Sequence, residues 1–449
     1  MKNTKIYKSS ILFFEDDPSK YTNIKEVINY ISNGILIIQN GIIKDMGEYE
    51  PICKKYNIDE TTIDNTFEDK LLIPGFIDTH VHYPQTEIIG SFGEQLLPWL
   101  EKYTFPTEMK FKDKNYAKEI SKIFLKELFK NGTTTAMVFA TVYKESVDAI
   151  FEEANKYKMR LIAGKVMMDR NAPQELLDDA DSSYEDSKEL IERWHEKDRL
   201  LYAITPRFAP TSTKEQLEKV KELKNKYPST YIQTHLSENL DEIEWVKTLF
   251  PEANSYLDVY DRFSLVTDKS IFAHAIYLED DEYETLSNKG ASVSLCPTSN
   301  LFLGSGLFKL RKLKKQNSNI GIGFGSDVGA GTSFSILKTI HEAYKVVSLE
   351  QNTSNREALG AFEAFYQATL GAAKSLRLDD KIGKLKKGYE ADFIALEFKA
   401  DDLQKLRIDR IKDDNSIESL EEKLFALMMM GDDRNISATV INGEVVYKK

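Results

Sequence analysis

Short apolar segments alternate with longer stretches of helical periodicity between residues 72 and 380. Eight of the apolar segments have the length of a buried strand: 72–78, 133–138, 160–164, 200–205, 231–235, 270–274, 291–295 and 321–327. A typical stretch between them is 115–130, where Ile120, Phe124 and Leu128 fall on one helix face. This alternation predicts a (β/α)8 barrel. A doubly wound sheet is the alternative, but no Gly-x-Gly-x-x-Gly sequence follows any of the segments.

Both ends of the chain carry a different, β-rich pattern. Asn40-Gly41 and Asn442-Gly443 each separate two apolar runs, and a type I′ hairpin turn favours this pair because both residues adopt positive φ. A further candidate strand covers residues 391–396. We therefore predict a small β-sandwich built from both termini. The predicted division is 1–70 for the N-terminal part of the sandwich, 71–382 for the barrel and 383–449 for the C-terminal part.

Composition and charge restrict the classes of function. The 449 residues carry a formal net charge of -12, so a nucleic-acid partner or an anionic membrane surface is not expected. No stretch approaches the roughly 18 apolar residues of a membrane span, and the N-terminal apolar run is too short and too acidic for a signal peptide. Cys53 and Cys296 are too few for a disulfide framework and have no metal-type spacing. These features predict a cytoplasmic protein.

Four of the six histidines fall at the carboxyl end of a predicted strand, namely His80, His82, His235 and His274. That end of a barrel is where enzymes of this architecture place their chemistry. His80 and His82 are two residues apart, so on an extended strand both imidazoles point to one side and can reach one ion at about 2 Å. A single histidine is more often a core or surface residue than a ligand. Four at one barrel mouth are not explained by chance.

Two carboxylates accompany these histidines. Glu238 follows His235 by three residues, and Asp327 ends the last predicted strand among glycines that let the backbone approach a ligand closely. Imidazoles with one carboxylate suit a catalytic divalent metal with an open position for water. We expect one zinc ion, and Fe2+ or Mn2+ would suit the same ligand types. A structural zinc site would instead be closed and would favour cysteine.

These motifs resemble those of the amidohydrolase superfamily. The segments that carry the resemblance are 74–82 and 234–238, with His274 and Asp327. A closer likeness, to the branch of that superfamily that deaminates guanine, rests on 82–85, 99–108, 206–208, 237–239, 296–300 and 431–435. The resemblance extends over residues 25–449, and its motifs are many and in the right order.

The resemblance implies roles for individual residues as well as the fold predicted above. The implied metal ligands are His80, His82, His235 and Asp327, with His274 beside the attacking water. The implied substrate contacts are Gln85, Arg207, Phe208 and Glu238, with Trp99 as a pocket wall or a core residue. No lysine that could be carbamylated to bridge two metals ends the fourth predicted strand, which favours a single ion. A homodimer is left open.

The implied reaction is the hydrolysis of guanine to xanthine and ammonia. The amino-bearing carbon of guanine is a poor electrophile and neutral water is a poor nucleophile, so a metal that lowers the pKa of water to about 7 would be needed. Asp327 would accept the proton of the water, His274 would orient it, and Glu238 would donate a proton to ring N3. Arg207 and Gln85 would bind the carbonyl edge of the base, where adenine presents an amino donor.

Other interpretations of the same residues remain. Arg207 could be a structural ion-pair residue and Gln85 a surface residue. A deaminase for another nucleobase or an aminated triazine would use the same metal ligands, although the segments around Gln85, Trp99 and Arg207 favour guanine. A catalytically inactive barrel that serves as a binding scaffold would be expected to have lost a ligand or Glu238, and the sequence has lost neither.

Overall fold

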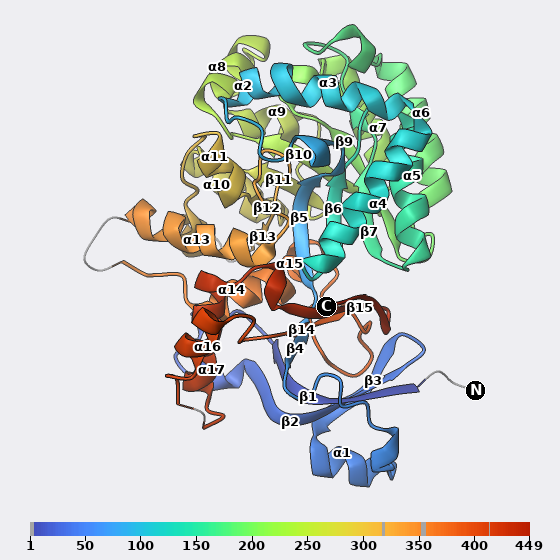
Figure 1. Ribbon diagram of the computed structural model, residues 1–449. Helices are drawn as coiled ribbons and strands as arrows, with labels where there is room; N and C mark the ends of the chain where they lie inside the picture. The colour runs from blue at the N-terminus through green and yellow to red at the C-terminus, as the bar shows by residue number, and fades with distance from the viewer. Residues whose placement is uncertain (1–3, 317–318, 352–355, 413) are drawn as a thin grey trace.

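The computed structural model describes residues 4–316, 319–351, 356–412 and 414–449. A barrel with helices around it forms the upper part of Figure 1, and a sheet from both ends of the chain lies below it. The predicted fold class is therefore confirmed. None of the helices in the described ranges combines the length and the apolar run that crossing a bilayer requires.

Eight parallel strands form the barrel wall. They are β5 (Phe76–His82), β6 (Thr133–Phe139), β7 (Arg160–Gly164), β9 (Leu200–Pro206), β10 (Tyr231–Leu236), β11 (Ser270–His274), β12 (Ser292–Leu295) and β13 (Gly321–Phe324), and the short β8 (Val166–Met167) also pairs with β9. Beyond β13 the wall closes on β5: Asp327 N donates to His80 O at 3.0 Å, and His82 N donates to Val328 O at 3.1 Å. This closure places Asp327 beside the paired histidines.

Helices between the strands surround the barrel. They are α4 (Lys114–Lys130), α5 (Lys144–Lys156), α6 (Ala180–Trp194), α7 (Lys214–Lys226), α8 (Leu240–Leu249), α9 (Tyr256–Arg262), α10 (Asp280–Lys289), α11 (Pro297–Phe302), α12 (Leu310–Gln316) and α13 (Ile336–Gln351). In α4 the predicted face of Ile120, Phe124 and Leu128 is buried, and the Asp113 side chain caps the first turn. Burying one such side chain contributes about 1.5–3 kcal/mol, so the apolar face fixes each helix to the wall.

The terminal sheet has seven strands. They are β1 (Thr4–Phe14), β2 (Ile28–Gln39), β3 (Ile42–Glu48), β4 (Leu71–Pro74), β14 (Phe393–Leu396), β15 (Ile436–Ile441) and β16 (Glu444–Lys448), in the order β16-β15-β14-β4-β1-β2-β3. Both predicted Asn-Gly turns have positive φ at both residues. The sheet curls until these turns meet, because a Cβ on Gly41 would lie 2.3 Å from Asn442 Oδ1. One curled sheet thus encloses the core that we expected a sandwich to enclose.

The first predicted barrel strand, 72–78, is divided between the two sheets. Residues Leu71–Pro74 form β4 in the terminal sheet, and the barrel strand β5 begins only at Phe76. Gly75 makes the crossing, where any side chain would collide with Thr134. His80 and His82 therefore lie within a strand rather than just after one. The domain limits at residues 70 and 382 stay predictions.

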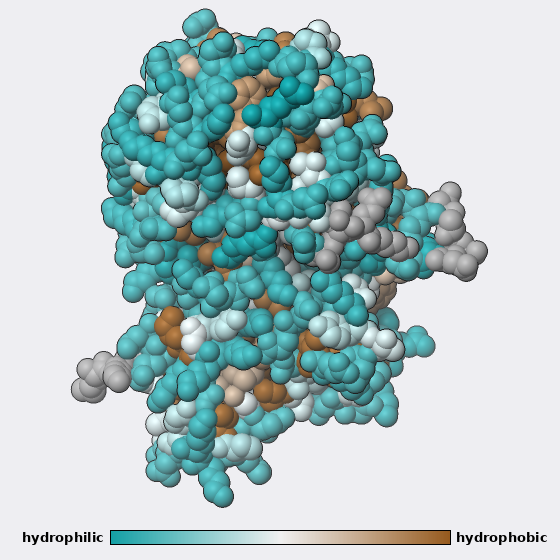
Figure 2. All heavy atoms as spheres, turned by 180° about the vertical axis from the view of Figure 1, so that it is seen from behind, coloured by the Kyte–Doolittle hydropathy of each residue, from teal (hydrophilic) through white to brown (hydrophobic). Residues whose placement is uncertain are grey.

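Shorter helices cover the terminal sheet and the lower end of the barrel. They are α1 (Tyr49–Tyr56), α14 (Ala361–Tyr366), α15 (Ala372–Ser375), α16 (Asp402–Ile408) and α17 (Ile417–Met430). Buried ion pairs join the two parts of the molecule, with Arg199 Nη2 2.6 Å from Glu390 Oε2 and Arg160 Nε 3.0 Å from the same oxygen. The face seen in Figure 2 is mainly hydrophilic, with hydrophobic side chains scattered over it.

Candidate active site

Three histidines and one aspartate bring their side chains together at the carboxyl end of the barrel strands. His82 Nε2 lies 3.3 Å from His80 Nε2 and 3.2 Å from His235 Nε2. Asp327 Oδ1 lies 3.3 Å from His80 Nε2 and 3.5 Å from His82 Nε2. Strands β5 and β10 carry the histidines, and the closure between β13 and β5 supplies the aspartate. All four residues predicted as metal ligands thus share one site.

The separations between these atoms fit a tetrahedral metal site. Ligand atoms about 2.0–2.1 Å from one ion lie about 3.3 Å from each other when they form a tetrahedron. His235 Nδ1 donates a hydrogen bond to the carbonyl oxygen of Arg207 at 2.7 Å, which leaves the lone pair of His235 Nε2 facing the other ligands. A cation at the centre therefore accounts for this arrangement better than hydrogen bonds between imidazoles.

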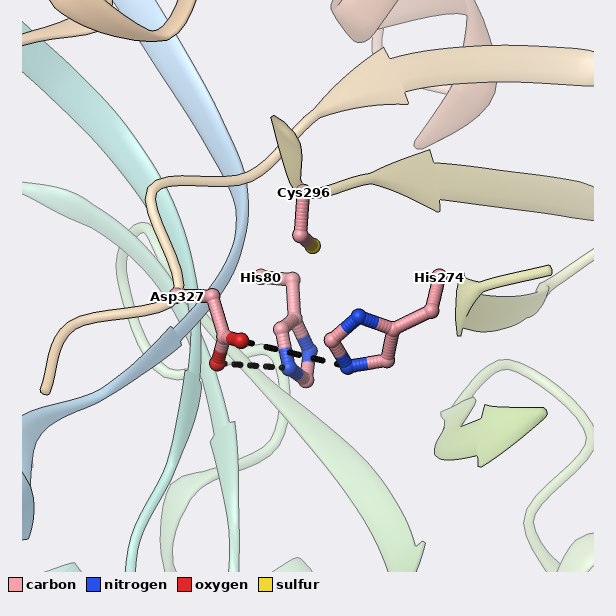
Figure 3. A group of neighbouring side chains, drawn as sticks. All are labelled: His80, His274, Cys296 and Asp327. Carbon is pink, nitrogen blue, oxygen red and sulfur yellow. Dashed lines mark ion pairs between the residues drawn. The ribbon is translucent and has the colours of Figure 1, made fainter. Parts of the chain in front are cut away.

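A second group of metal-binding side chains overlaps the first (Figure 3). In it the Asp327 carboxylate points toward the rings of His80 and His274, and the Cys296 thiol lies beside His80. Burial raises the pKa of the Cys296 thiol well above its usual range, and the thiol lies 3.5 Å from the Ser294 carbonyl oxygen. Because the thiolate is the form that binds metals, Cys296 fits a neutral core residue better than a ligand.

His274 is held beside the metal-binding cluster by Asn300. Its Nδ1 lies 2.8 Å from Asn300 Oδ1 and donates to it, so Nε2 faces the carboxylates. Glu238 Oε2 lies 3.3 Å from that Nε2, and Asp327 Oδ2 lies 3.9 Å from it. Although burial opposes it, the negative charges of Glu238 and Asp327 raise the pKa of His274. These contacts place the His274 ring where its Nε2 can orient a water molecule.

Glu238 is buried just after β10, and hydrogen bonds hold both its side chain and its backbone. Ser305 Oγ donates to Glu238 Oε1 at 3.1 Å, and the Glu238 backbone N–H donates to Glu242 Oε2 at 3.0 Å. Burial raises the pKa of Glu238 to about 7. A carboxyl group with that pKa can donate a proton near neutral pH, as the predicted role requires.

The pKa of Asp327 is shifted in the opposite direction to that of Glu238. Burial works against its charge, but hydrogen bonding and charge from His80 and the charge of His274 lower its pKa to about 2. The residue has a φ of 51°, and His274 a φ of 71°, a region that costs non-glycine residues about 1–3 kcal/mol each. The surrounding hydrogen bonds hold both residues in these conformations, which direct their side chains into the cluster.

A small cavity adjoins the cluster. Its wall includes all five residues that we predicted as substrate contacts: Gln85, Trp99, Arg207, Phe208 and Glu238. The rest of the wall comprises Leu96, Leu100, Leu303, Ala330 and Glu242 together with His82, His235, His274 and Asp327. The mixture of apolar surface with a few aimed polar groups is typical of a small-molecule site.

One segment of the chain covers this cavity. It contains α2 (Leu96–Trp99), a π-helical turn at Leu100–Thr104 and α3 (Phe105–Glu108), which lie across the upper end of the barrel in Figure 1. Trp99 is 1% exposed, packs edge-on against Phe302, and has no hydrogen-bond partner for Nε1 among the described residues. Trp99 is thus both a core residue and part of the cavity wall.

A larger cavity opens at the other end of the barrel, beside the starts of β12 and β13. It contains several basic residues, but Lys314 pairs with Asp17 and Lys374 pairs with Asp16. It holds none of the histidines and none of the predicted site residues. The candidate site is therefore the smaller cavity at the carboxyl end of the strands.

Four polar residues of the site received no role from the sequence: Glu108, Glu242, Asn300 and Ser305. Glu242 had a usable signal, because Asn239 and Glu242 have the spacing of a capping box, and they form one at the start of α8. The other three depend on contacts between residues 26 to 99 positions apart in the sequence. No local pattern indicates such contacts.

Comparison with known proteins gives concordant matches. The model of the amidohydrolase family matches residues 71–446. Guanine deaminase of Escherichia coli K12 is 51% identical over 97% of this chain and 95% of its own length. The crystal structure of guanine deaminase from Bradyrhizobium japonicum superposes with a TM-score of 0.96, at 39% identity, over 99% of each chain. A guanine deaminase structure from C. acetobutylicum, with guanine bound in the active site, has a TM-score of 0.88 at 31% identity and covers 99% of this chain.

Proposed function

The chain belongs to the amidohydrolase family, and on that premise we propose that it is a guanine deaminase, which hydrolyses guanine to xanthine and ammonia. One observation carries this function beyond the family relationship. A single cavity joins the histidine and aspartate cluster to Glu238 on one side and to Arg207 and Gln85 on the other. Groups suited to hydrolysis and groups suited to binding a carbonyl-bearing base therefore line the same cavity.

We propose that His80, His82, His235 and Asp327 hold one divalent metal, with zinc as the ion of first choice. Such an ion, when bound, supplies the Lewis acidity that makes water a nucleophile at neutral pH. Asp327 accepts the proton of the attacking water, and its low pKa is consistent with its being ionised beforehand. His274 orients that water through Nε2, because Asn300 engages Nδ1.

Glu238 completes the proposed proton transfers. Attack at C2 places negative charge on the purine ring, and a proton donated by Glu238 to N3 relieves it. The raised pKa of Glu238 means that the carboxyl group can carry this proton near pH 7. A proton delivered afterwards to the exocyclic nitrogen allows ammonia to leave, so the overall reaction consumes one water and releases xanthine and ammonia.

Arg207 and Gln85 are proposed to bind the oxygen-bearing edge of guanine, with Phe208 and Trp99 as apolar walls. Guanine presents acceptors at O6 and N7, whereas adenine presents an amino donor in place of O6. An N–H group of Arg207 that faces a donor would be left without a partner, which costs about 1–3 kcal/mol and more for a charged group. This cost favours guanine.

The experiment that tests the function is a panel of nucleobases given to metal-replete protein, with ammonia release as the readout. We expect turnover of guanine and, under the same conditions, far slower turnover of adenine, cytosine and 2,6-diaminopurine. Metal analysis of the same sample should give about one divalent ion per chain, since four ligands surround one position. Bound metal with no ammonia from guanine would contradict the proposal.

Replacing Arg207 by alanine should raise KM for guanine about 10- to 100-fold, because a charge-assisted hydrogen bond is worth about 1.5–3 kcal/mol. The metal content should not change, since only the backbone carbonyl of Arg207 contacts His235. Steady-state kinetics and metal analysis check both statements. Loss of the metal in this variant would show that its side chain supports the metal site instead.

Two finer features also belong to the proposal. The acidic net charge of -12 and the absence of a disulfide between Cys53 and Cys296 support a cytoplasmic enzyme without nucleic-acid or membrane partners. A homodimer is one arrangement open to the enzyme, and the mass of the native protein in solution measures it.

A further inference from the structure

A single carboxylate touches both residues that are proposed to bind the oxygen-bearing edge of the base. Glu108, the last residue of α3, is fully buried. Arg207 Nη1 donates to Glu108 Oε1 at 3.0 Å and to Oε2 at 2.8 Å. Burial raises the pKa of Glu108, and the nearby Arg207 guanidinium and Gln85 side chain lower it. Because a carboxylate only accepts hydrogen bonds, Gln85 must donate through its Nε2.

These contacts decide which polar atoms remain for a substrate. Among the described residues, Arg207 makes its side-chain hydrogen bonds through Nη1 alone, so Nε and Nη2 keep their N–H groups. The Arg207 guanidinium also lies 5.7 Å from the centre of the Phe105 ring, which limits its rotation. Gln85 Oε1 lies 3.4 Å from the Gly329 backbone nitrogen. This contact agrees with an amide whose oxygen faces Gly329 and whose nitrogen faces Glu108.

Both Arg207 and Gln85 have long side chains with several rotatable bonds, and both border the cavity. Ordering such a side chain costs about 0.5–1.5 kcal/mol when a ligand has to do it. A buried guanidinium without a counter-charge would also be costly. Glu108 removes both costs before the substrate arrives, because it supplies the negative charge and fixes the two side chains in one arrangement.

We propose that Glu108 is the positioning residue that sets the specificity of the enzyme for purines with a carbonyl group at C6. The inference rests on the proposed function. Glu108 does not touch the reacting atoms; it acts through Arg207 and Gln85, whose free N–H groups it directs at the carbonyl oxygen. A purine with an amino group at C6 would place that donor against the N–H donors of Arg207 and Gln85, which Glu108 prevents from rotating.

The position of Glu108 in the fold adds a consequence. It lies on the segment that also supplies Leu96, Trp99 and Leu100 to the cavity wall, whereas Arg207 follows β9. The ion pair therefore ties the covering segment to the barrel. The residue that orients Arg207 thus belongs to the same segment that covers the cavity.

The simpler explanation is that the ion pair between Glu108 and Arg207 only stabilises the fold. A second ion pair of the same kind, outside the site, serves as the control for this explanation. Arg311 and Glu363 form a bidentate pair, with Nη1 to Oε1 at 2.6 Å and Nη2 to Oε2 at 2.8 Å. Glu363 is 5% exposed and lies outside the wall of the substrate cavity. Glu363→Gln should lower the thermal stability and leave KM and substrate preference as they are.

The test compares wild type with Glu108→Gln, Glu108→Asp and Glu363→Gln, all metal-replete, on guanine and 2,6-diaminopurine. Glu108→Gln should raise KM for guanine at least about tenfold, with kcat within about threefold of wild type. The ratio of kcat/KM for guanine over 2,6-diaminopurine should fall at least about tenfold, because Arg207 is then free to turn away from an amino group. Glu108→Asp, which keeps the charge, should recover part of the ratio. Metal content should be unchanged throughout.

A double-mutant cycle with Arg207→Ala distinguishes an effect of Glu108 that acts through Arg207 from a general loss of stability. If Glu108 acts through Arg207, Glu108→Gln should change KM and the substrate ratio less than about threefold in the Arg207→Ala background. An undiminished effect in that background, or a substrate ratio in Glu108→Gln equal to that of Glu363→Gln, would overturn the inference while the wild-type activity stands. Failure of the wild type to release ammonia from guanine would overturn the proposed function itself, and the inference with it. If Glu108→Gln does not fold, the Glu108→Asp ratio decides alone, and a value equal to wild type counts against the inference.

Discussion

Replacing Glu238 by glutamine is expected to lower kcat for guanine by at least about 10²-fold while the protein keeps its full metal content. Glutamine preserves the size of the side chain and can still accept the hydrogen bond from Ser305, which lies 3.1 Å from Glu238 Oε1. It cannot donate a carboxylic proton to N3 of the purine, so charge builds up on the ring during attack. Steady-state kinetics together with metal analysis of the same sample measure the effect.

Glu282→Gln is the matched control for this variant. Glu282 is 3% exposed, caps α10 in the same way that Glu242 caps α8, and lies outside the cavity wall. We expect this substitution to change stability without changing kcat. A kcat near the wild-type value in Glu238→Gln would remove Glu238 from the proton transfers and would leave the metal site as the only source of catalysis.

Replacing His235 by alanine is expected to abolish both metal binding and turnover. His235 Nε2 lies 3.2 Å from His82 Nε2, and its Nδ1 donates to the Arg207 carbonyl, so it is the proposed ligand that connects β10 to the pair on β5. Loss even of a residue that supports a ligand lowers metal affinity about 10- to 100-fold, and loss of the ligand itself should exceed that range. Metal analysis after dialysis and ammonia release from guanine provide the two measurements.

His195→Ala supplies the corresponding control. His195 is also largely buried and hydrogen-bonded, with Nδ1 accepting from Tyr202 N at 3.0 Å and Nε2 2.9 Å from Ser229 Oγ. It follows α6 and takes no part in the cluster, so its loss should leave the metal content at the wild-type value. Retention of a full complement of metal by His235→Ala would mean that His235 is not a ligand.

The sequence predicted the fold well because its signals are local. The Asn-Gly turns need positive φ at both residues, and both adopt it. The buried face of α4 follows the 3.6-residue period. The prediction of a single barrel strand at 72–78 was wrong, because the same apolar residues suit a strand in either sheet. One sheet ends and the other begins at Gly75, where a side chain would collide with Thr134.

The candidate site was predictable to the extent that it lies at strand ends. Histidines in β5, β10 and β11 were placed by pattern alone, and their convergence follows from the parallel barrel. The roles of Gln85, Arg207 and Glu238 came from resemblance to relatives, and they stay predictions until variants are measured. Glu108 ends the segment 99–108 that carried the resemblance, but it received no role, because its partner Arg207 is 99 residues away and lies on a different element.

The place of β4 in the terminal sheet has a consequence for how the chain matures. It lies between β1 and β14, and its Ile73 pairs with Ile394, so the strand just before the His80 and His82 pair gains one of its neighbours only when the last sixty or so residues have left the ribosome. Pairing across so many residues is slow, because a long loop must close before the contact forms. A nascent or truncated chain that lacks β14 would thus expose one edge of β4. We expect such chains to depend on chaperones until β14 has paired with β4.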